Sequence, residues 1–517
     1  MRSLAVLSLS VLLLLTGAAG NPKSPQHTAP IDFVAKTNRA LATRPGSHTP
    51  WTSERSRWQK YVKASTFNQT TSPLFEQTPG YGSGGFYSDS MVTGDFNGDG
   101  KSDIAVLNQC VQLVNHSCSG NGTVGVLLGN GDGTYQNAVT SDAGVANPQA
   151  FSAGDFNGDG KLDLIEISYG GQVFVLLGKG DGTFSVGQNL TVGAYGTSVT
   201  VGDFNQDGKL DAVVGTTANM AGSITMLLGN GDGTFSLGPS YQIGNEYSFP
   251  GPAVVGDFNH DGKLDVAMTT QTSDEPYSPG PEINVFLGNG DGTLQPVMQY
   301  DSGGCDALAI AAGDFNADGN VDLVVANLGK GNCSQVNYLI DGPIGVLLGN
   351  GDGTFQPVQT YSLGGISLAV GDVNDDGKQD IAVGTGYCVA EAGVCPVGPF
   401  GTNLVSFLLG NGDGTFQVSP VSYTTAGFEG GSPGTSAVVV QDLNGDGSLD
   451  VAVANLSQDA FSGSHGSVGV LLNRADGTFK AVPSYNAIPN VGEWSIPVWV
   501  CRFQWRRQAR SADWRKP

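Results

Sequence analysis

Charge is scarce in this sequence, and most of it is negative. Only 14% of the 517 residues are charged, and 24 Lys and Arg stand against 47 Asp and Glu, giving a net charge of −23. An acidic surface is repelled by nucleic acids and by anionic membranes, so we expect neither as a partner.

Histidine is also rare, and the common catalytic motifs are missing. The five histidines are scattered, with no partner at catalytic spacing: His27, His48, His116, His260 and His465. The sequence contains no Gly-x-Ser-x-Gly, no phosphate-binding glycine loop and no His-Glu-x-x-His. We therefore expect no enzymatic activity, and we interpret His260 as a solvent-facing filler.

Long apolar runs are absent after the first 20 residues. Residues 1–20 resemble a secretory signal, with Arg2, a short apolar run and small residues suited to cleavage. No later stretch approaches the roughly 18 apolar residues of a membrane-spanning helix. The sequence predicts a secreted protein, extracellular or periplasmic after removal of the signal, without insertion into the membrane.

Cysteine is sparse but grouped. Six of the seven cysteines form near pairs, which in an oxidising compartment predict disulfides: Cys110 with Cys118, Cys305 with Cys333, and Cys388 with Cys395. There is no Cys-x-x-Cys, so zinc is not expected. Cys501 is left over.

What the sequence has in abundance is a nine-residue acidic loop, Asp-Phe-Asn-Gly-Asp-Gly-Lys-Ser-Asp at 95–103. It returns at 155–163, 203–211, 257–265, 314–322, 372–380 and 442–450. All seven copies have Asp at positions 1, 5 and 9, Asn at position 3 and Gly at position 6. Oxygen side chains at alternate positions followed by Gly are how a chain wraps a hard cation such as calcium. Positions 1, 5 and 9 of these loops account for 21 of the 47 acidic residues, and seven divalent cations would offset 14 of the 23 net negative charges.

The surrounding pattern predicts short β-strands. Runs of three to six Val, Ile, Leu and Phe residues, bounded by Gly, Asn and Asp, lead into and out of each acidic loop. A second signature, Gly-Asn-Gly-Asp-Gly-Thr-Phe, separates two further apolar runs in each unit and predicts a tight hairpin turn. These glycine turns lie near Asp132, Asp181, Asp232, Asp291, Asp352, Asp413 and Asp476.

The period of the repeat predicts the fold. The first Asp residues of successive loops are 48 to 70 residues apart. Units of four antiparallel strands at this period favour an all-β propeller in which each unit is one blade. The seven complete units predict seven four-stranded blades. The resulting divisions are a signal at 1–20, a polar linker at 21–72, the propeller at 73–486 and an incomplete eighth repeat at 487–517.

Strand direction sorts the loops onto two faces. Acidic loops and glycine turns fall on one face, here called the bottom, while the connections between second and third strands fall on the opposite, top face. Differences in length occur mainly in five top connections: 108–122, 269–282, 326–343, 385–401 and 454–467. They carry five aromatic residues, Tyr277, Tyr338, Tyr387, Phe400 and Phe461. These connections are either a recognition surface or decoration whose aromatics pack locally.

The paired motifs resemble the FG-GAP/VCBS-type repeats of integrin α-chain heads and of many secreted bacterial proteins, over roughly residues 73–485. The resemblance implies a calcium-binding β-propeller with up to seven structural Ca²⁺ ions. It places the ligands at the side chains of positions 1, 3, 5 and 9 and the carbonyl of position 7. By position, these residues are Asp95, Asn97, Asp99, Lys101 and Asp103; Asp155, Asn157, Asp159, Lys161 and Asp163; Asp203, Asn205, Asp207, Lys209 and Asp211; Asp257, Asn259, Asp261, Lys263 and Asp265; Asp314, Asn316, Asp318, Asn320 and Asp322; Asp372, Asn374, Asp376, Lys378 and Asp380; and Asp442, Asn444, Asp446, Ser448 and Asp450.

The end of the chain departs from the pattern. After residues 495–500, which resemble another first strand, an acidic loop is due, but an Arg- and Trp-rich segment follows from Arg502. A back-translation of that segment, read one base later, gives Asp-Phe-Asn-Gly-Asp-Gly-Lys-Pro-Asp. Our hypothesis is a frameshift; the alternative is a genuine basic tail. Residues 73–81 resemble a lone fourth strand, which in an unbroken parent could have closed an eighth blade.

Three functions remain open on these grounds. The resemblance suggests a secreted binding or cell-adhesion module that recognises a glycan or protein, with calcium in a structural role. The alternative is a polysaccharide lyase or sugar-converting enzyme on the same propeller, which would need acid and base residues on the top face or in the central channel. The third is a purely structural surface protein.

Overall fold

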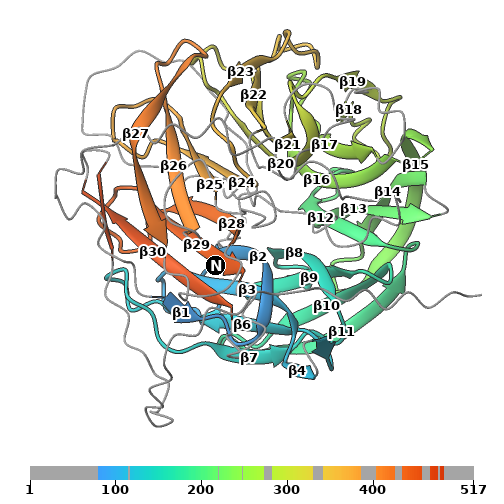
Figure 1. Cartoon of the computed structure of the whole chain (residues 1–517). Helices are drawn as coiled ribbons and strands as arrows, with labels where there is room; N and C mark the ends of the chain where they lie inside the picture. Colours follow the sequence, from blue (N-terminus) through green and yellow to red (C-terminus); the bar gives the residue numbers. More distant parts are fainter. Residues whose placement is uncertain are drawn as a thin grey trace, which may run out of the picture. The chain divides into compact units, whose positions relative to one another are not determined.

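The computed structural model describes residues 80–481 except for 115–116, 219–220, 247, 273–281, 330–341, 386–402, 426–433, 457–465 and 475–477. In this part of the chain every regular element is a β-strand and none is a helix. The strands form seven antiparallel blades arranged as a β-propeller (Figure 1), which confirms the predicted fold class. The predicted signal, linker and eighth repeat lie outside the described residues.

Six blades are continuous in sequence, and each is a sheet of four strands. Blade 1 has β2 (Phe86–Gly94), β3 (Asp103–Cys110), β6 (Thr123–Leu127) and β7 (Val139–Asp142). Blade 2 has β8 (Pro148–Gly154), β9 (Asp163–Ser168), β10 (Gln172–Gly178) and β11 (Phe184–Thr191). Blade 3 has β12 (Gly196–Gly202), β13 (Asp211–Ala218), β14 (Ala221–Gly229) and β15 (Phe235–Glu246).

The second half of the ring repeats this plan. Blade 4 has β16 (Ser248–Gly256), β17 (Asp265–Thr272), β18 (Ile283–Phe286) and β19 (Met298–Tyr300). Blade 5 has β20 (Cys305–Gly313), β21 (Asp322–Gly329), β22 (Ile344–Leu347) and β23 (Gln359–Tyr361). Blade 6 has β24 (Ser367–Gly371), β25 (Asp380–Thr385), β26 (Asn403–Gly410) and β27 (Phe416–Thr425). A small hairpin, β4 (Gln112–Val114) and β5 (Ser117–Ser119), lies in the connection between β3 and β6.

The hydrophobic core lies between the blades. Successive side chains of a strand point to opposite faces of its sheet, and the inner strands are buried along their length, so each face packs against one neighbouring blade. One buried cluster, for example, joins Leu107 and Val126 of blade 1 to Phe151 and Leu176 of blade 2. The first strand of every blade lies innermost in Figure 1, and the fourth strand lies at the circumference.

Blade 7 closes the ring by using both ends of the described chain. It contains β28 (Gly434–Gln441), β29 (Asp450–Leu456) and β30 (Ser467–Asn473). The outer edge of β30 pairs with β1 (Gly80–Gly82) near its start and with β31 (Phe479–Ala481) near its end. Of the lone strand expected at residues 73–81, the described part is the start of β1, which in this chain pairs with the seventh blade. The eighth blade of an unbroken parent stays a prediction. The ring of described blades is closed at seven, since buried residues of blades 1 and 7 share one core cluster.

Candidate metal centres and the opposite face

Each acidic loop joins the first strand of a blade to its second, at the bottom end of the sheet. Its first carboxylate folds the loop around itself. In blade 1, Asp95 Oδ1 accepts the backbone N–H groups of Gly98 and Asp99 at 2.7 and 3.1 Å, and Oδ2 accepts that of Gly100 at 2.8 Å. In the other six loops too, the first Asp accepts the N–H of the position-6 glycine, at 2.7 to 3.0 Å.

Positions 3 and 5 continue this pattern of side chains bonded to the loop backbone. Asn97 Oδ1 accepts the N–H of Asp99 at 2.9 Å, and Asp99 Oδ1 accepts the N–H of Lys101 at 3.0 Å. The ammonium of Lys101 lies 3.3 Å from Asp99 Oδ2 in an exposed ion pair. A single exposed lysine offsets little of the charge of three carboxylates.

The ninth residue of each loop is a buried carboxylate. Asp103 is fully buried; its Oδ2 accepts the N–H of Phe96 at 2.9 Å and its Oδ1 accepts the N–H of Gly129 at 2.7 Å. It therefore fastens the loop to the end of the third strand. Burial raises the pKa of this carboxyl in every blade, and raises the pKa of Asp163 to about 6 and that of Asp265 to about 7.

Positive φ angles explain where glycine is used in these loops. Position 6 is glycine in all seven loops and has a φ between 79° and 93°. Position 4 also has a positive φ in every loop, but four loops carry a residue with a side chain there: Gln206, His260, Ala317 and Asp375, with φ of 56° to 58°. Position 6 is thus the more selective position, although both are left-handed.

The donor set of the acidic loops fits a hard cation. Positions 1, 3, 5 and 9 of each loop bring three carboxylates and one amide oxygen, and no nitrogen or sulfur ligand. In the part of the chain that the structure describes, no group of three or more His, Cys, Asp or Glu side chains is gathered as a metal cluster. The loop oxygens instead accept backbone N–H groups. In blade 1, Asp95 Oδ2, Asn97 Oδ1 and Asp99 Oδ1 each accept one N–H, which leaves each of them a lone pair for a cation.

The glycine turns do more than reverse the chain. Asp132 Oδ1 accepts the N–H of Thr134 at 3.0 Å and holds the turn, as the sequence predicts for a tight hairpin. The last glycine of the turn then bonds to the previous blade: the N–H of Gly182 donates to the carbonyl of Phe96 at 3.1 Å. Four further pairs repeat this bond at 2.9 to 3.1 Å: Gly233 to Phe156, Gly292 to Phe204, Gly353 to Phe258 and Gly414 to Phe315. The turn near Asp476 lies outside the described residues.

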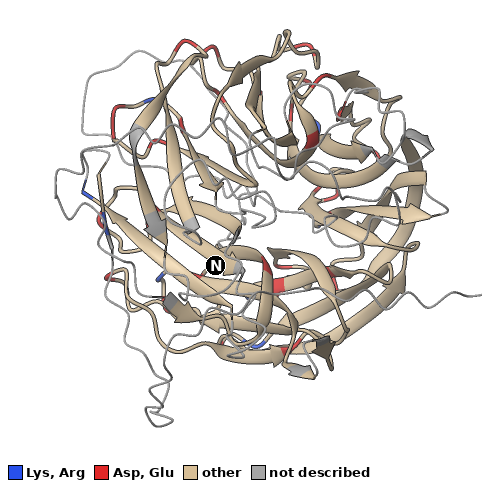
Figure 2. Cartoon of the chain, in the orientation of Figure 1, with Lys and Arg blue, Asp and Glu red and all other residues tan. Residues whose placement is uncertain are grey.

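Neighbouring acidic loops also contact each other through position 4. Gln206 Nε2 donates to the carbonyl of Gly262 at 2.8 Å, in the next loop of the ring. His260 Nε2 lies 2.8 Å from Asn320 Oδ1, and Ser448 Oγ donates to Asp375 Oδ2 at 2.9 Å. His260 is therefore exposed as expected, but it links two loops, so filler was the wrong interpretation. Figure 2 shows Asp and Glu distributed around the ring, with few Lys or Arg between them.

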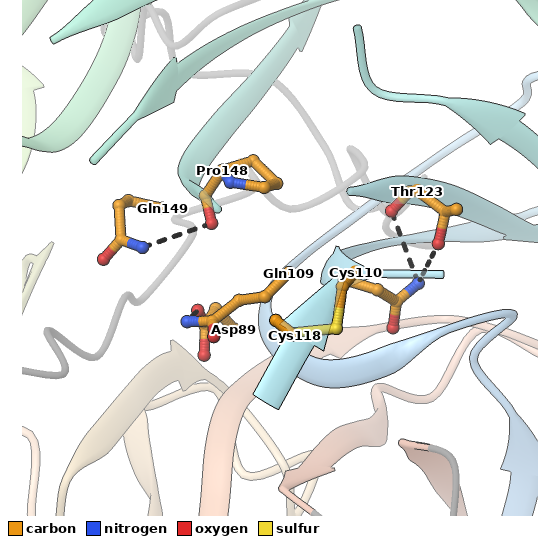
Figure 3. Close-up of a disulfide and its surroundings, with 8 residues drawn as sticks. Asp89, Gln109, Cys110, Cys118, Thr123, Pro148 and Gln149 are labelled. Carbon is orange, nitrogen blue, oxygen red and sulfur yellow. Dashed lines mark hydrogen bonds between the residues drawn. A yellow bond between two sulfur atoms is a disulfide. The ribbon is translucent and has the colours of Figure 1, made fainter. Parts of the chain in front are cut away.

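The top face carries the disulfide predicted in the first connection. Cys110 and Cys118 are bonded, with Cα atoms 5.5 Å apart, and tie the end of β3 to the β4–β5 hairpin (Figure 3). Cys305 is also disulfide-bonded. Its predicted partner Cys333, the predicted pair Cys388 and Cys395, and Cys501 lie outside the described residues. So do the five aromatics expected to form a recognition surface.

Two exposed aromatic residues on the top face were missed by the sequence analysis. Tyr169 follows β9 in its short connection to β10, and Tyr195 precedes β12 in the link between blades 2 and 3. Their rings meet edge to face, with centroids 5.0 Å apart. The sequence analysis placed recognition in the long connections and so passed over these short ones. The signal for an exposed aromatic was its position beside glycine, at Gly170-Gly171 for Tyr169 and at Gly196 for Tyr195.

Comparison with known proteins identifies the repeat. A family model described as FG-GAP-like repeat matches residues 113–166, 155–214, 213–268 and 273–325, and a model described as FG-GAP repeat matches residues 364–391. The chain carries FG-GAP-type repeats. The first match starts in β4 and ends in β9. The FG-GAP sequence unit is therefore offset from the blade, and contains the outer strands of one blade and the inner strands of the next.

Solved structures similar to the chain are distant. The BP39L lectin from Burkholderia pseudomallei has 14% identity and a TM-score of 0.49, covering 77% of this chain and 99% of its own. Kuenenia stuttgartiensis hydrazine synthase has 14% identity and a TM-score of 0.46, covering 79% and 100%. BBS1N, solved in complex with ARL6DN, has 10% identity and a TM-score of 0.43, covering 77% and 98%. These similarities identify no function. No curated protein matches the chain.

Among the described residues, no helix has the length and apolar character needed to cross a bilayer.

Proposed function

We propose that the chain is a secreted, calcium-stabilised binding or adhesion module that recognises a glycan or a protein through its top face. The observation that carries this proposal is that the two faces of the propeller differ in how far their loops are fixed and in how far they vary. The bottom loops and turns are bonded to their own blade and to the next one, while the top connections differ in length and sequence. Recognition is commonly placed on such loops, held by a rigid scaffold.

Calcium would act as a structural ion in this proposal. The side chains of positions 1, 3, 5 and 9 and the carbonyl of position 7 would hold it in up to seven loops. A bound dication offsets the repulsion among three carboxylates that have one lysine at most beside them. The loop also holds its shape through its own hydrogen bonds. Position 1 accepts the backbone N–H groups of the loop, and the buried position 9 fastens the loop to the third strand, as Asp103 does at Gly129.

Two features favour export of the protein, which a binding module for extracellular ligands requires. A disulfide between Cys110 and Cys118 fits an oxidising compartment, as does the signal-like sequence of residues 1–20. We propose an extracellular or periplasmic location on these grounds.

The test is a binding screen with the full-length protein on an immobilised glycan array and on a panel of extracellular matrix proteins. We expect calcium-dependent binding to at least one of them, and loss of binding in chelator because the scaffold loosens. Absence of binding to both panels in calcium would contradict a binding module. Shortened glycans recovered from the array would support the enzymatic alternative instead.

A further inference from the structure

We propose that the corner formed by Tyr169 and Tyr195 on the top face binds a neutral sugar ring of a glycan. This inference rests on the proposed function and specifies its site and ligand class. The two rings lie at 72° to each other with their centroids 5.0 Å apart, and the residues are 46% and 49% exposed. They are the only aromatic residues among the exposed large hydrophobic residues of the described chain.

The backbone holds the two rings in place from two different blades. The N–H of Tyr169 donates to the carbonyl of Asn147 at 3.0 Å, and the carbonyl of Tyr195 accepts from Thr217 at 3.2 Å. The two segments touch, since a Cβ on Gly171 would lie 2.4 Å from the carbonyl oxygen of Gly193. The corner is therefore formed before any ligand arrives, which reduces the entropy lost on binding.

The backbone conformation at this site is costly. Tyr195 has a φ of 50°, and the same register position, eight residues before the acidic loop, has a φ of 53° at Asn147, 54° at Asp306 and 56° at Tyr87. A residue with a side chain is disfavoured in this left-handed region. The conformation recurs in four blades, and in the link between blades 2 and 3 the residue that adopts it is an exposed aromatic.

An amide side chain lies beside the corner. Asn147 is exposed, and its backbone carbonyl accepts the N–H of Tyr169. Its side-chain amide can both donate to and accept from a ligand. The site thus combines two phenol rings and one amide, all of them neutral hydrogen-bonding groups.

This combination favours a sugar over a protein. A pyranose presents an apolar face of C–H groups, which packs on an aromatic ring, and a rim of hydroxyls, which bonds to amides. A stable protein interface buries about 800 Å² on each partner around an apolar centre. The other exposed large hydrophobic residues do not extend the corner into such a surface. Val111 and Val114 lie at the hairpin after β3, and Val186, Leu237 and Val418 on outer strands.

The experiment uses the full-length protein in calcium. Its probes are an array of neutral oligosaccharides and calorimetric titration with N-acetylglucosamine, galactose, mannose and fucose. The variants are Tyr169→Ala and Tyr195→Gly, and the control is Leu237→Ala, an exposed apolar residue at the circumference. Tyr195→Gly removes the ring and the strain together, so its melting temperature should be unchanged or higher. We expect both tyrosine variants to bind at least about tenfold more weakly and the control to bind as the wild type does.

The outcomes separate this inference from the proposed function. Glycan binding that survives both tyrosine variants overturns the site and leaves the binding module standing. Binding to a matrix protein but to no sugar overturns the ligand class, even where the tyrosine variants weaken it. Absence of binding to either class overturns both proposals.

Discussion

Gly182, in the glycine turn of blade 2, donates its backbone N–H to the carbonyl of Phe96, in the acidic loop of blade 1, at 3.1 Å. Phe184, two residues further on, packs its ring edge to face on that of Phe96, with centroids 6.0 Å apart. The turn of blade 2 thus covers the acidic loop of blade 1, and the glycine turns of blades 3 to 6 make the same bond to the blade before them. Loop order and blade packing should be coupled for this reason.

A methyl group placed in this contact should separate the blades. Gly233 has a φ of 82°, and a Cβ there would lie 2.8 Å from a methyl carbon of Leu177 in blade 2. We expect Gly233→Ala to lower the free energy of unfolding by about 2–4 kcal/mol, through left-handed strain and steric overlap. The matched control is Gly158→Ala, whose φ is 72° with nothing within 4 Å. Denaturant unfolding measures both variants, and equal losses would contradict the coupling.

Tyr81 should fasten the ring at its closure. Tyr81 accepts the N–H of Tyr135 on its hydroxyl at 3.3 Å, just as Tyr361 accepts that of Phe416 at 3.1 Å between blades 5 and 6. We expect Tyr81→Phe to cost about 0.5–1.5 kcal/mol, as Tyr361→Phe should, because one hydrogen bond is lost. Tyr81→Ala should cost about 3–5 kcal/mol, because a buried aromatic side chain is removed.

Thermal unfolding of these three variants tests the closure. Hydrogen exchange would locate the effect, and we expect faster exchange in β30 and β2 for Tyr81→Ala. Unaltered stability of Tyr81→Ala would mean that β1 does not hold the ring closed.

Removal of one ligand should matter more when metal is present. Asp155→Asn in blade 2 removes one carboxylate and keeps one acceptor oxygen, but its NH2 group replaces the second oxygen, which also accepts a loop N–H. If calcium is present at 100 times its dissociation constant, loss of one site lowers the free energy of unfolding by about 2.7 kcal/mol. In chelator we expect a smaller loss of about 0.5–1.5 kcal/mol, because only the hydrogen bond is lost. A loss of the same size in both conditions would assign a purely structural role to Asp155.

Glu166 offers a test by pH. It lies in β9 and is fully buried, and neither carboxylate oxygen has a hydrogen-bond partner among the described residues. Burial raises the pKa of Glu166 well above its usual value, with a smaller contribution from the charge of Asp142. The folded protein therefore holds a proton that the unfolded chain releases near pH 4.5, and this contribution to stability is lost as pH rises above that value.

Replacement of Glu166 removes this dependence. We expect Glu166→Met to raise the melting temperature, with a gain over the wild type that increases from pH 5 to pH 8. Glu166→Gln is the control, since it keeps the shape and a polar group but cannot ionise; its gain should also increase with pH. A difference from the wild type that stays constant across this range would contradict the buried neutral carboxyl.

Local patterns predicted most of the fold because the spacing of the repeated acidic loops gives the length of one blade. The acidic loops, the glycine turns and the Cys110–Cys118 disulfide were all predicted from short segments. The bonds from Gly182 to Phe96 and from Gln206 to Gly262 were not, since they join residues 56 or more positions apart whose side-by-side placement depends on the curvature of the ring. The Tyr169–Tyr195 corner was missed for the same reason: two short connections become neighbours only when two blades pack together. Glu166 was visible as an acid in the apolar segment Leu164-Ile-Glu-Ile167, but its lack of a partner depends on tertiary packing.

The most direct test of calcium as the structural ion is a thermal melt of the full-length protein in millimolar calcium and in chelator, with magnesium as the control. Seven loops that bind the folded state alone would each add to stability by mass action, so we expect the melting temperature to fall by about ten degrees or more in chelator. Magnesium, which demands a tighter octahedral site, should restore little of the loss. The same melting temperature in calcium and in chelator would contradict the account.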